Sequence, residues 1–189
     1  MKTRLLMLTV AMSCALAGNA IALTKTEYKT QKDQISADYK VNRDKCGAMK
    51  ANAKDICVSE AKGAEKVANA ELESQYKPSA KNTRDVAMAK ADSAYNTAKE
   101  KCDDLAGNAK DVCVKDAKAA HVKAKEDAKV AKVSADTSKD KTEKMNDAKK
   151  DANAETREAN YKAAKERCDS LAGNAKDTCQ NDAKAKFGM

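Results

Sequence analysis

Apolar residues recur every three or four positions along most of the chain, which is the spacing of one face of an α-helix. The clearest such seam covers residues 88–105 and consists of Met88, Ala91, Tyr95, Ala98, Cys102 and Leu105. The seam over residues 113–131 is nearly all alanine: Cys113, Ala117, Ala120, Ala124 and Ala131. The pattern predicts long amphipathic helices that pack as in a coiled coil, with small residues that let antiparallel helices approach closely.

One sequence motif occurs three times. In each copy a tyrosine stands seven residues before a first cysteine, Asn-Ala-Lys-Asp follows, and a second cysteine comes eleven residues after the first. The repeated positions are Tyr39, Cys46, Asn52 and Cys57, then Tyr95, Cys102, Asn108 and Cys113, then Tyr161, Cys168, Asn174 and Cys179. The chain therefore consists of three related units.

The middle of each motif carries the signals that end one helix and begin another. Gly107 suits the left-handed residue just past a helix end, and Asn108 suits the N-cap of the next helix. Asn52 and Asn174 are expected to be N-caps in the same way. In the first copy Ala51 replaces the glycine, so we expect its turn to have a different shape.

Each cysteine pair is expected to form a disulfide across an antiparallel hairpin. If the chain reverses after Gly107, Cys102 and Cys113 lie five residues to either side and face each other. The other expected pairs are Cys46 with Cys57 and Cys168 with Cys179. One uninterrupted helix is the alternative; it would hold the two sulfurs about 16 Å apart, so that they could pair only with another chain. We favour the hairpin, because glycine followed by asparagine has no use inside a continuous helix.

Six helices are expected, near residues 24–50, 52–76, 79–106, 108–133, 139–172 and 174–187. The breaks between units fall at Pro78, which ends a helix, and at the polar segment 134–138. The expected hairpin repeats are therefore residues 23–77, 78–136 and 137–189. The fold is expected to be all-α, with three disulfide-stapled hairpins that either stack as an up-down bundle or form an extended array of independent hairpins on flexible joints.

The composition explains why such helices need crosslinks. Of 189 residues, 42% are apolar and 35% charged, yet there is one Phe, no Trp and one Pro, and alanine contributes 38. Leu, Ile, Val and Phe make up only about a tenth of the residues from Leu23 onward. Compact α/β enzymes, β-sandwiches and β-barrels are excluded, since they need a thick layer of branched and aromatic side chains. Disulfides, each worth roughly 2–4 kcal/mol, would compensate for the thin core.

Residues 1–22 have the pattern of a cleaved secretory signal peptide: two basic residues, an apolar run over 5–17 and a small-x-small site at 20–22. The run is shorter than the roughly twenty residues of a membrane span, and no transmembrane segment is expected after cleavage. We expect Cys14 to be an ordinary leader residue rather than a lipidation site. The expected location is the periplasm, where the six remaining cysteines would oxidise in pairs.

No set of residues typical of catalysis is present, so we expect neither an enzyme nor a cofactor. His121 is the only histidine and is expected to be solvated on a polar helix. The Cys-x10-Cys spacing matches neither structural zinc sites nor redox Cys-x-x-Cys motifs, and Asp103-Asp104 are expected to be solvated helix-end charges, so no metal site is predicted. The repeated tyrosines are expected to fill the core, with contact to a ligand or partner as the alternative: Tyr39, Tyr95 and Tyr161.

The net charge is +8 at pH 7, from 37 basic and 29 acidic residues. Acidic residues often lie three or four positions from a lysine, which neutralises most of the charge along a helix surface. Nucleic-acid binding needs an unbalanced basic stripe and is not expected. Envelope proteins or an anionic envelope surface are the expected partners, and a homo-oligomer stays open.

The repeat at residues 95–113 and 161–179 resembles that of a family of exported Ala/Lys-rich helical proteins of Gram-negative bacteria. The resemblance extends from about Tyr28 onward and implies a periplasmic helical protein, without an established activity or a catalytic residue. By composition the chain is also similar to the helical segment of the Tol–Pal protein TolA. That segment has no such cysteine repeats, and TolA carries an N-terminal membrane anchor.

Three hypotheses about function follow. The leading one is a non-enzymatic periplasmic structural or protein-interaction protein that acts as a spacer or scaffold in the cell envelope. The second is a stress-protective holdase that presents its helical seams to unfolded clients. The third is a metal-handling protein that binds metal through reduced cysteine pairs.

Overall fold

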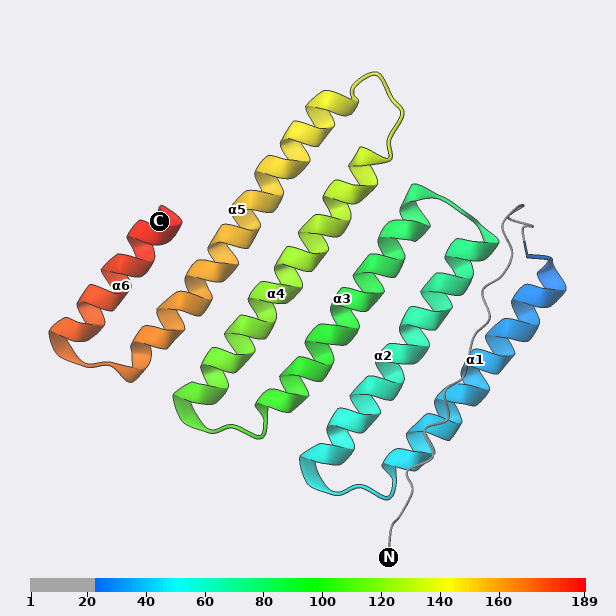
Figure 1. The fold of residues 1–189 in the computed structure, drawn as a ribbon, viewed down its shortest axis with the longest axis horizontal. Helices are drawn as coiled ribbons and strands as arrows, with labels where there is room; N and C mark the ends of the chain where they lie inside the picture. Colours follow the sequence, from blue (N-terminus) through cyan, green and yellow to red (C-terminus); the bar gives the residue numbers. More distant parts are fainter. Residues whose placement is uncertain (1–22) are drawn as a thin grey trace, which may run out of the picture.

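A computed structural model describes residues 23–189, in which six α-helices lie side by side in a single row (Figure 1). The helices are α1 (Lys25–Cys46), α2 (Ala51–Tyr76), α3 (Ala80–Cys102), α4 (Gly107–Ser134), α5 (Lys141–Arg167) and α6 (Gly173–Phe187), with a short 3₁₀ helix η1 (Cys168–Ser170) after α5. Extensive contacts join only helices that follow one another in the described chain. The predicted all-α fold with stapled hairpins is confirmed, and successive hairpins pack against each other in one row instead of standing as independent units on flexible joints.

The three predicted disulfides are present, and they close three turns along one edge of the row (Figure 1). Their Cα–Cα distances are 5.6 Å for Cys46–Cys57, 5.6 Å for Cys102–Cys113 and 5.7 Å for Cys168–Cys179. These distances lie in the ordinary range for a disulfide. The connections α2–α3 and α4–α5 lie along the opposite edge of the row and carry no disulfide.

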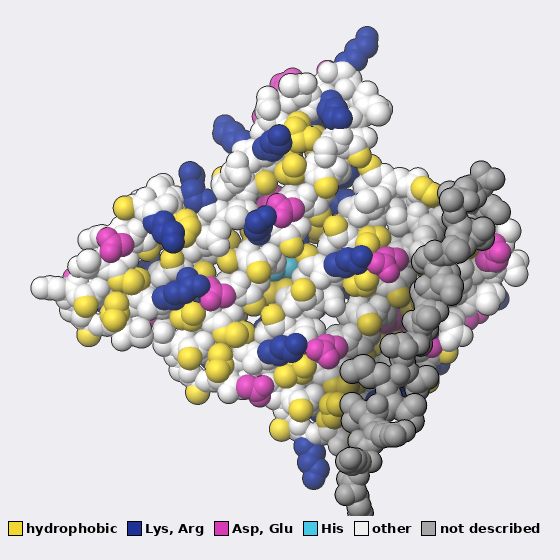
Figure 2. Space-filling model, in the orientation of Figure 1, with side chains coloured by type: hydrophobic (Ala, Val, Ile, Leu, Met, Phe, Trp, Pro, Cys, Tyr) yellow, Lys and Arg dark blue, Asp and Glu magenta, His cyan; other side chains and the backbone are white. Residues whose placement is uncertain are grey.

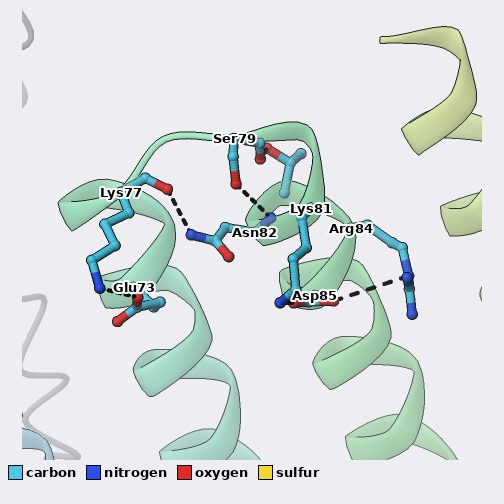
Figure 3. A network of polar contacts seen from close by, with 8 residues as sticks. Glu73, Lys77, Ser79, Lys81, Asn82, Arg84 and Asp85 are labelled. Atoms are coloured by element: carbon cyan, nitrogen blue, oxygen red, sulfur yellow. Dashed lines mark hydrogen bonds and ion pairs between the residues drawn. The ribbon is translucent and has the colours of Figure 1, made fainter. Parts of the chain in front are cut away.

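At the α2–α3 connection, side chains satisfy the ends of both helices (Figure 3). The Ser79 hydroxyl accepts a hydrogen bond from the Asn82 backbone N–H at 3.1 Å and thereby caps α3. The Asn82 side-chain amide donates to the carbonyl of Lys77, the C-cap residue of α2, at 2.6 Å. Asn82 therefore ties the end of the first hairpin to the start of the second.

The core is a thin row of small side chains. Leu72 is the only buried apolar side chain larger than cysteine in the described residues. The other buried apolar side chains are alanines and cysteines: Cys46, Ala61, Ala89, Ala91, Cys102, Ala119, Ala128, Ala152, Ala163, Cys168 and Ala183. A buried alanine removes little apolar area from water, so these interfaces depend on close helix approach and on polar links.

The first helix of each hairpin ends earlier than the sequence predicts. The expected ends were near residues 50, 106 and 172, whereas α1 and α3 end at Cys46 and Cys102, and α5 ends at Arg167 with η1 extending the helical backbone to Ser170. In the second hairpin the chain turns after Cys102 and becomes extended at Ala106 (φ −130°, ψ 158°) before α4 begins. The end of the first helix and the start of the second are therefore separated by a short turn, and Gly107 belongs to the second helix.

The prediction that Asn52, Asn108 and Asn174 are N-caps is wrong. The N-cap residues are Lys50, Ala106 and Ala172, and none of them makes a side-chain capping bond. Each asparagine lies two residues further on, inside the first helical turn. Its side chain is therefore free to contact another helix.

The expectation of a different first turn is also wrong. Gly107 and Gly173 adopt left-handed backbone conformations with φ of 55° and 56°, and Ala51 adopts the same conformation with φ 48°. A residue with a Cβ atom pays about 1–2 kcal/mol for this conformation. The shared geometry of the disulfide turn therefore overrides the local preference of alanine.

Candidate interaction surfaces

The repeated asparagine joins each hairpin to the next. Asn52 Nδ2, at the start of α2, donates a hydrogen bond to the Glu100 carbonyl in the last turn of α3 at 2.7 Å. Asn108 Nδ2 donates in the same way to the Glu166 carbonyl at the end of α5, at 3.0 Å. Each of these carbonyls also accepts from a backbone N–H at the end of its own helix, from Asp103 at Glu100 and from Cys168 at Glu166, so the asparagine adds a second hydrogen bond from the neighbouring hairpin. We call this contact the asparagine clamp.

An ion pair repeats beside each clamp. Its acidic member stands three residues after the second cysteine of one hairpin, and its basic member stands just before the first cysteine of the next. Lys101 Nζ lies 3.3 Å from Glu60 Oε1, and Arg167 pairs with Asp116 at the second junction. The clamp and the ion pair together specify how successive hairpins align.

Two open grooves occupy equivalent places at the junctions between hairpins. The groove between α2 and α3 has a volume of about 330 Å³, and the groove between α4 and α5 about 450 Å³. Ser59, Lys62 and Lys66 line the first groove, and their repeat equivalents Lys115, Lys118 and Val122 line the second. Because α2 and α4 run in the same direction in the row and equivalent residues of the two helices line the grooves, the grooves open on the same face of the array.

Each hairpin tip carries an exposed apolar residue three positions after the first cysteine. These residues are Met49, Leu105 and Leu171, with 44%, 44% and 42% of their surface exposed. Leu105 was expected to continue the apolar seam of α3, but the helix ends before it. All three residues lie in the turns that the disulfides close, so each of these turns exposes one large apolar side chain.

His121 is buried, contrary to the expectation that it is solvated. Its Nε2 lies 2.7 Å from Asp92 Oδ1, and its ring stacks on Tyr95 with centroids 4.6 Å apart. Lys118 Nζ lies 5.5 Å from the centroid of the Tyr95 ring. The cluster could not be predicted from the sequence, because Asp92 and Tyr95 come from the other helix of the hairpin.

Asp92 links three helices. Its carboxylate lies between Lys66 Nζ of α2, at 2.6 Å, and His121 Nε2 of α4, at 2.7 Å. Burial alone would raise the pKa of Asp92, but hydrogen bonds from Lys66 and His121 outweigh it and hold that pKa below its ordinary value. Asp92 is therefore ionised at neutral pH and joins the first hairpin to the second.

The three repeated tyrosines are half-buried in the structure: Tyr39, Tyr95 and Tyr161. Only Tyr95 stacks on another aromatic ring among these three in the described chain. A further pair closes the open end of the first hairpin, where the Tyr28 and Tyr76 ring centroids lie 4.4 Å apart and the Tyr28 hydroxyl donates to Glu73 at 2.8 Å. The tyrosines thus contribute to the hairpin seams without being fully enclosed.

On the face shown in Figure 2, lysine and arginine side chains lie beside acidic ones, with apolar patches between them. Between α2 and α3, Lys90 pairs with Glu71 at 2.7 Å and Lys66 pairs with Asp92 at 2.6 Å. No helix between Lys25 and Phe187 is long and apolar enough to cross a membrane. The predicted signal peptide, including Cys14, lies outside the described residues.

Within residues 23–189 no group of three or more His, Cys, Asp or Glu side chains is placed to hold a metal ion. Asp103 and Asp169 at the turns instead pair with Lys110 and Lys176, at 3.0 and 2.8 Å. The six cysteines of the described chain are all paired, so metal handling through thiolates would require prior reduction.

In comparisons with protein-family models, with curated proteins and with solved structures, nothing matches this chain. Its surfaces therefore have to be interpreted from their own geometry. The repeated features are the asparagine clamp, the junction grooves and the apolar tips. Three disulfides fit an oxidising compartment.

Proposed function

We propose that the chain is a non-enzymatic scaffold of the cell envelope, exported to the periplasm, which binds a protein partner across the grooves between its hairpins. One observation carries this proposal: the two junctions form grooves from equivalent residues on the same face of a one-helix-thick array. A repeated surface suits a partner that is itself long or repetitive, as in other repeat proteins.

The chemistry of the grooves favours a polar partner. The first groove has Asp55 and Glu100 beside its lysines, and the second has Glu155 and Glu158 beside Lys162. Successive grooves are two helices apart, or about 16–20 Å at ordinary helix spacing. A partner helix or extended segment with charges of both signs, laid across the row, would contact both grooves.

Site-specific photocrosslinking in living cells tests the proposal. A photoreactive residue replaces Ser59 in one variant and the equivalent Lys115 in another, and Lys123, which is exposed and lines neither groove, is the control. We expect the same envelope protein in adducts from residues 59 and 115 and none from residue 123. Equal capture from all three positions, or no capture, would contradict a groove-bound partner.

A holdase is the second candidate, because the apolar tips Met49, Leu105 and Leu171 could contact unfolded chains. It predicts that near-stoichiometric amounts of the oxidised protein suppress aggregation of a reduced test protein. Replacing all three tip residues with lysine should abolish the suppression. If the unmodified protein gives no suppression, this candidate is rejected.

A further inference from the structure

Within residues 23–189 the row of helices has two open ends, and the features that join one hairpin to the next recur there without a neighbouring helix. At the α6 end, Asn174 is equivalent to the clamping residues Asn52 and Asn108, and it is exposed. Asp182 is the equivalent of Glu60, but unlike Glu60 it has no ion-pair partner in the described chain. The α6 end therefore carries the donor side of a third junction.

Small residues mark the same surface. The sixth position after the second cysteine is Gly63 in α2 and Ala119 in α4, and both are buried. At Gly63 an added Cβ atom would lie 1.9 Å from Ser93 Oγ of α3, which shows how closely the helices approach. The equivalent residue of α6, Ala185, is exposed.

The α1 end carries the matching acceptor side. Val41 stands five residues before Cys46, and 54% of its surface is exposed. The equivalent residue of α5, Ala163, is 2% exposed, and that of α3, Thr97, contacts Ser59 of α2 at 3.4 Å. An exposed valine at a position that inner hairpins cover indicates a surface that a neighbouring helix can cover.

We propose that α6 of one copy packs against α1 of a second copy, so that the array continues from chain to chain by the same contact that joins hairpins within the chain. Asn174 would donate to the Asp44 carbonyl of the second copy, as Asn108 does to that of Glu166. Asp182 would pair with Lys45, the equivalent of Lys101. This inference rests on the repeat geometry and not on the proposed function.

The directions of the helices fit this contact. Helices α2 and α4 run away from the disulfide edge and pack on helices that run toward it, and α6 and α1 have these two directions (Figure 1). The contact is head-to-tail, so each added copy leaves a new open end and the product grows instead of closing as a dimer.

The association should be weak and strongly dependent on concentration. Helix α6 has 15 residues, against 26 in α2 and 28 in α4, so the new interface is shorter than those inside the chain. An interface of one short helix pair falls below the size of stable protein complexes. Self-association is therefore expected at high local concentration.

Sedimentation velocity of the oxidised protein over a range of concentrations tests the proposal. We expect the mean mass to rise steadily with concentration, without a plateau at the dimer. Val41→Lys should reduce the association constant by at least about tenfold, since it places a charge in a close apolar contact. Met49→Lys, an exposed tip of the same hairpin, should leave it unchanged.

Charge reversal gives an independent check. Lys45→Glu and Asp182→Lys should each weaken self-association, because each opposes like charges at the contact. A mixture of the two variants, and the double variant, should recover it. A protein that stays monomeric, a mass that stops at a dimer, or association that Val41→Lys leaves intact would overturn the proposal.

Discussion

The α3–α4 pair inside the second hairpin and the α2–α3 pair between the first two hairpins are held in different ways. Inside the hairpin, the Cys102–Cys113 disulfide closes one end and Tyr95 stacks on His121 further along. Between hairpins there is no covalent bond in the described chain apart from the backbone connection. Polar links and the close approach at Gly63 act there instead. Along the row, helix pairs held by a disulfide therefore alternate with helix pairs held by polar contacts.

Removing the disulfide of the α3–α4 pair should have the largest effect on stability. Replacing Cys102 and Cys113 together with alanine should lower the free energy of unfolding by about 2–4 kcal/mol, because the unfolded chain regains the freedom of a closed loop. Urea unfolding followed by circular dichroism measures it. If the oxidised protein and the double variant have equal stability, the staples do not compensate for the thin core.

Forcing two hairpins apart should have the next largest effect. Gly63→Ala places a Cβ atom 2.9 Å from Ser93 Cβ as well as against its hydroxyl, so α2 and α3 must separate. We expect a loss of about 1–3 kcal/mol in thermal or urea unfolding, as for an overpacked core.

The second junction supplies the control for this variant. There the equivalent residues are Ala119 and Ala159, so the pair Gly63→Ala with Ser93→Ala reproduces a combination that the protein already contains. The second substitution should recover most of the lost stability. A double variant as unstable as Gly63→Ala would mean that the two junctions are not equivalent in spacing.

The asparagine clamp can be tested with a matched pair of single variants. Asn108→Ala removes the hydrogen bond from α4 to the Glu166 carbonyl and should cost about 1 kcal/mol in unfolding free energy. Asn174→Ala, measured at low concentration, should cost close to nothing, since its side chain is exposed. Equal losses for both variants would show that the asparagine acts within its own turn rather than between hairpins.

The smallest effect is expected inside the turns. Ala51→Gly relieves a left-handed alanine and should raise the free energy of unfolding by about 0.5–1 kcal/mol, whereas Gly107→Ala should lower it by a similar amount. Both changes are read in the same urea titration. Opposite signs for equivalent positions would show that the three turns share one geometry, while matching signs would contradict it.

The sequence was sufficient to predict the elements that local chemistry determines. The helix periodicity and the symmetric cysteines around Gly107 and Gly173 predicted six helices and three disulfides, and the structure has both. The ends of the first helices were misjudged because glycine followed by asparagine indicates a chain reversal without giving the residue at which the first helix ends. In the structure that glycine opens the second helix.

The contacts between hairpins could not be predicted in this way. Asn52 and Asn108 recur at a position that suits an N-cap equally well, and only the placement of the next hairpin reveals their carbonyl partners. Within the second hairpin, too, the burial of His121 depends on Asp92 and Tyr95 from the other helix. The recurrence of the asparagines indicated that these positions matter. The alanine seams, however, are too uniform to show how successive hairpins pack against each other.

The order of the cysteines has a consequence for biosynthesis. The six thiols of the described chain allow many different pairings, but each of its three disulfides joins two cysteines that are neighbours in the sequence. A chain that enters an oxidising solution N-terminus first would present each pair together, about ten residues apart, before the next pair emerges. Native crosslinks can thus form in order during synthesis or translocation, without the slow reshuffling that interleaved disulfides require.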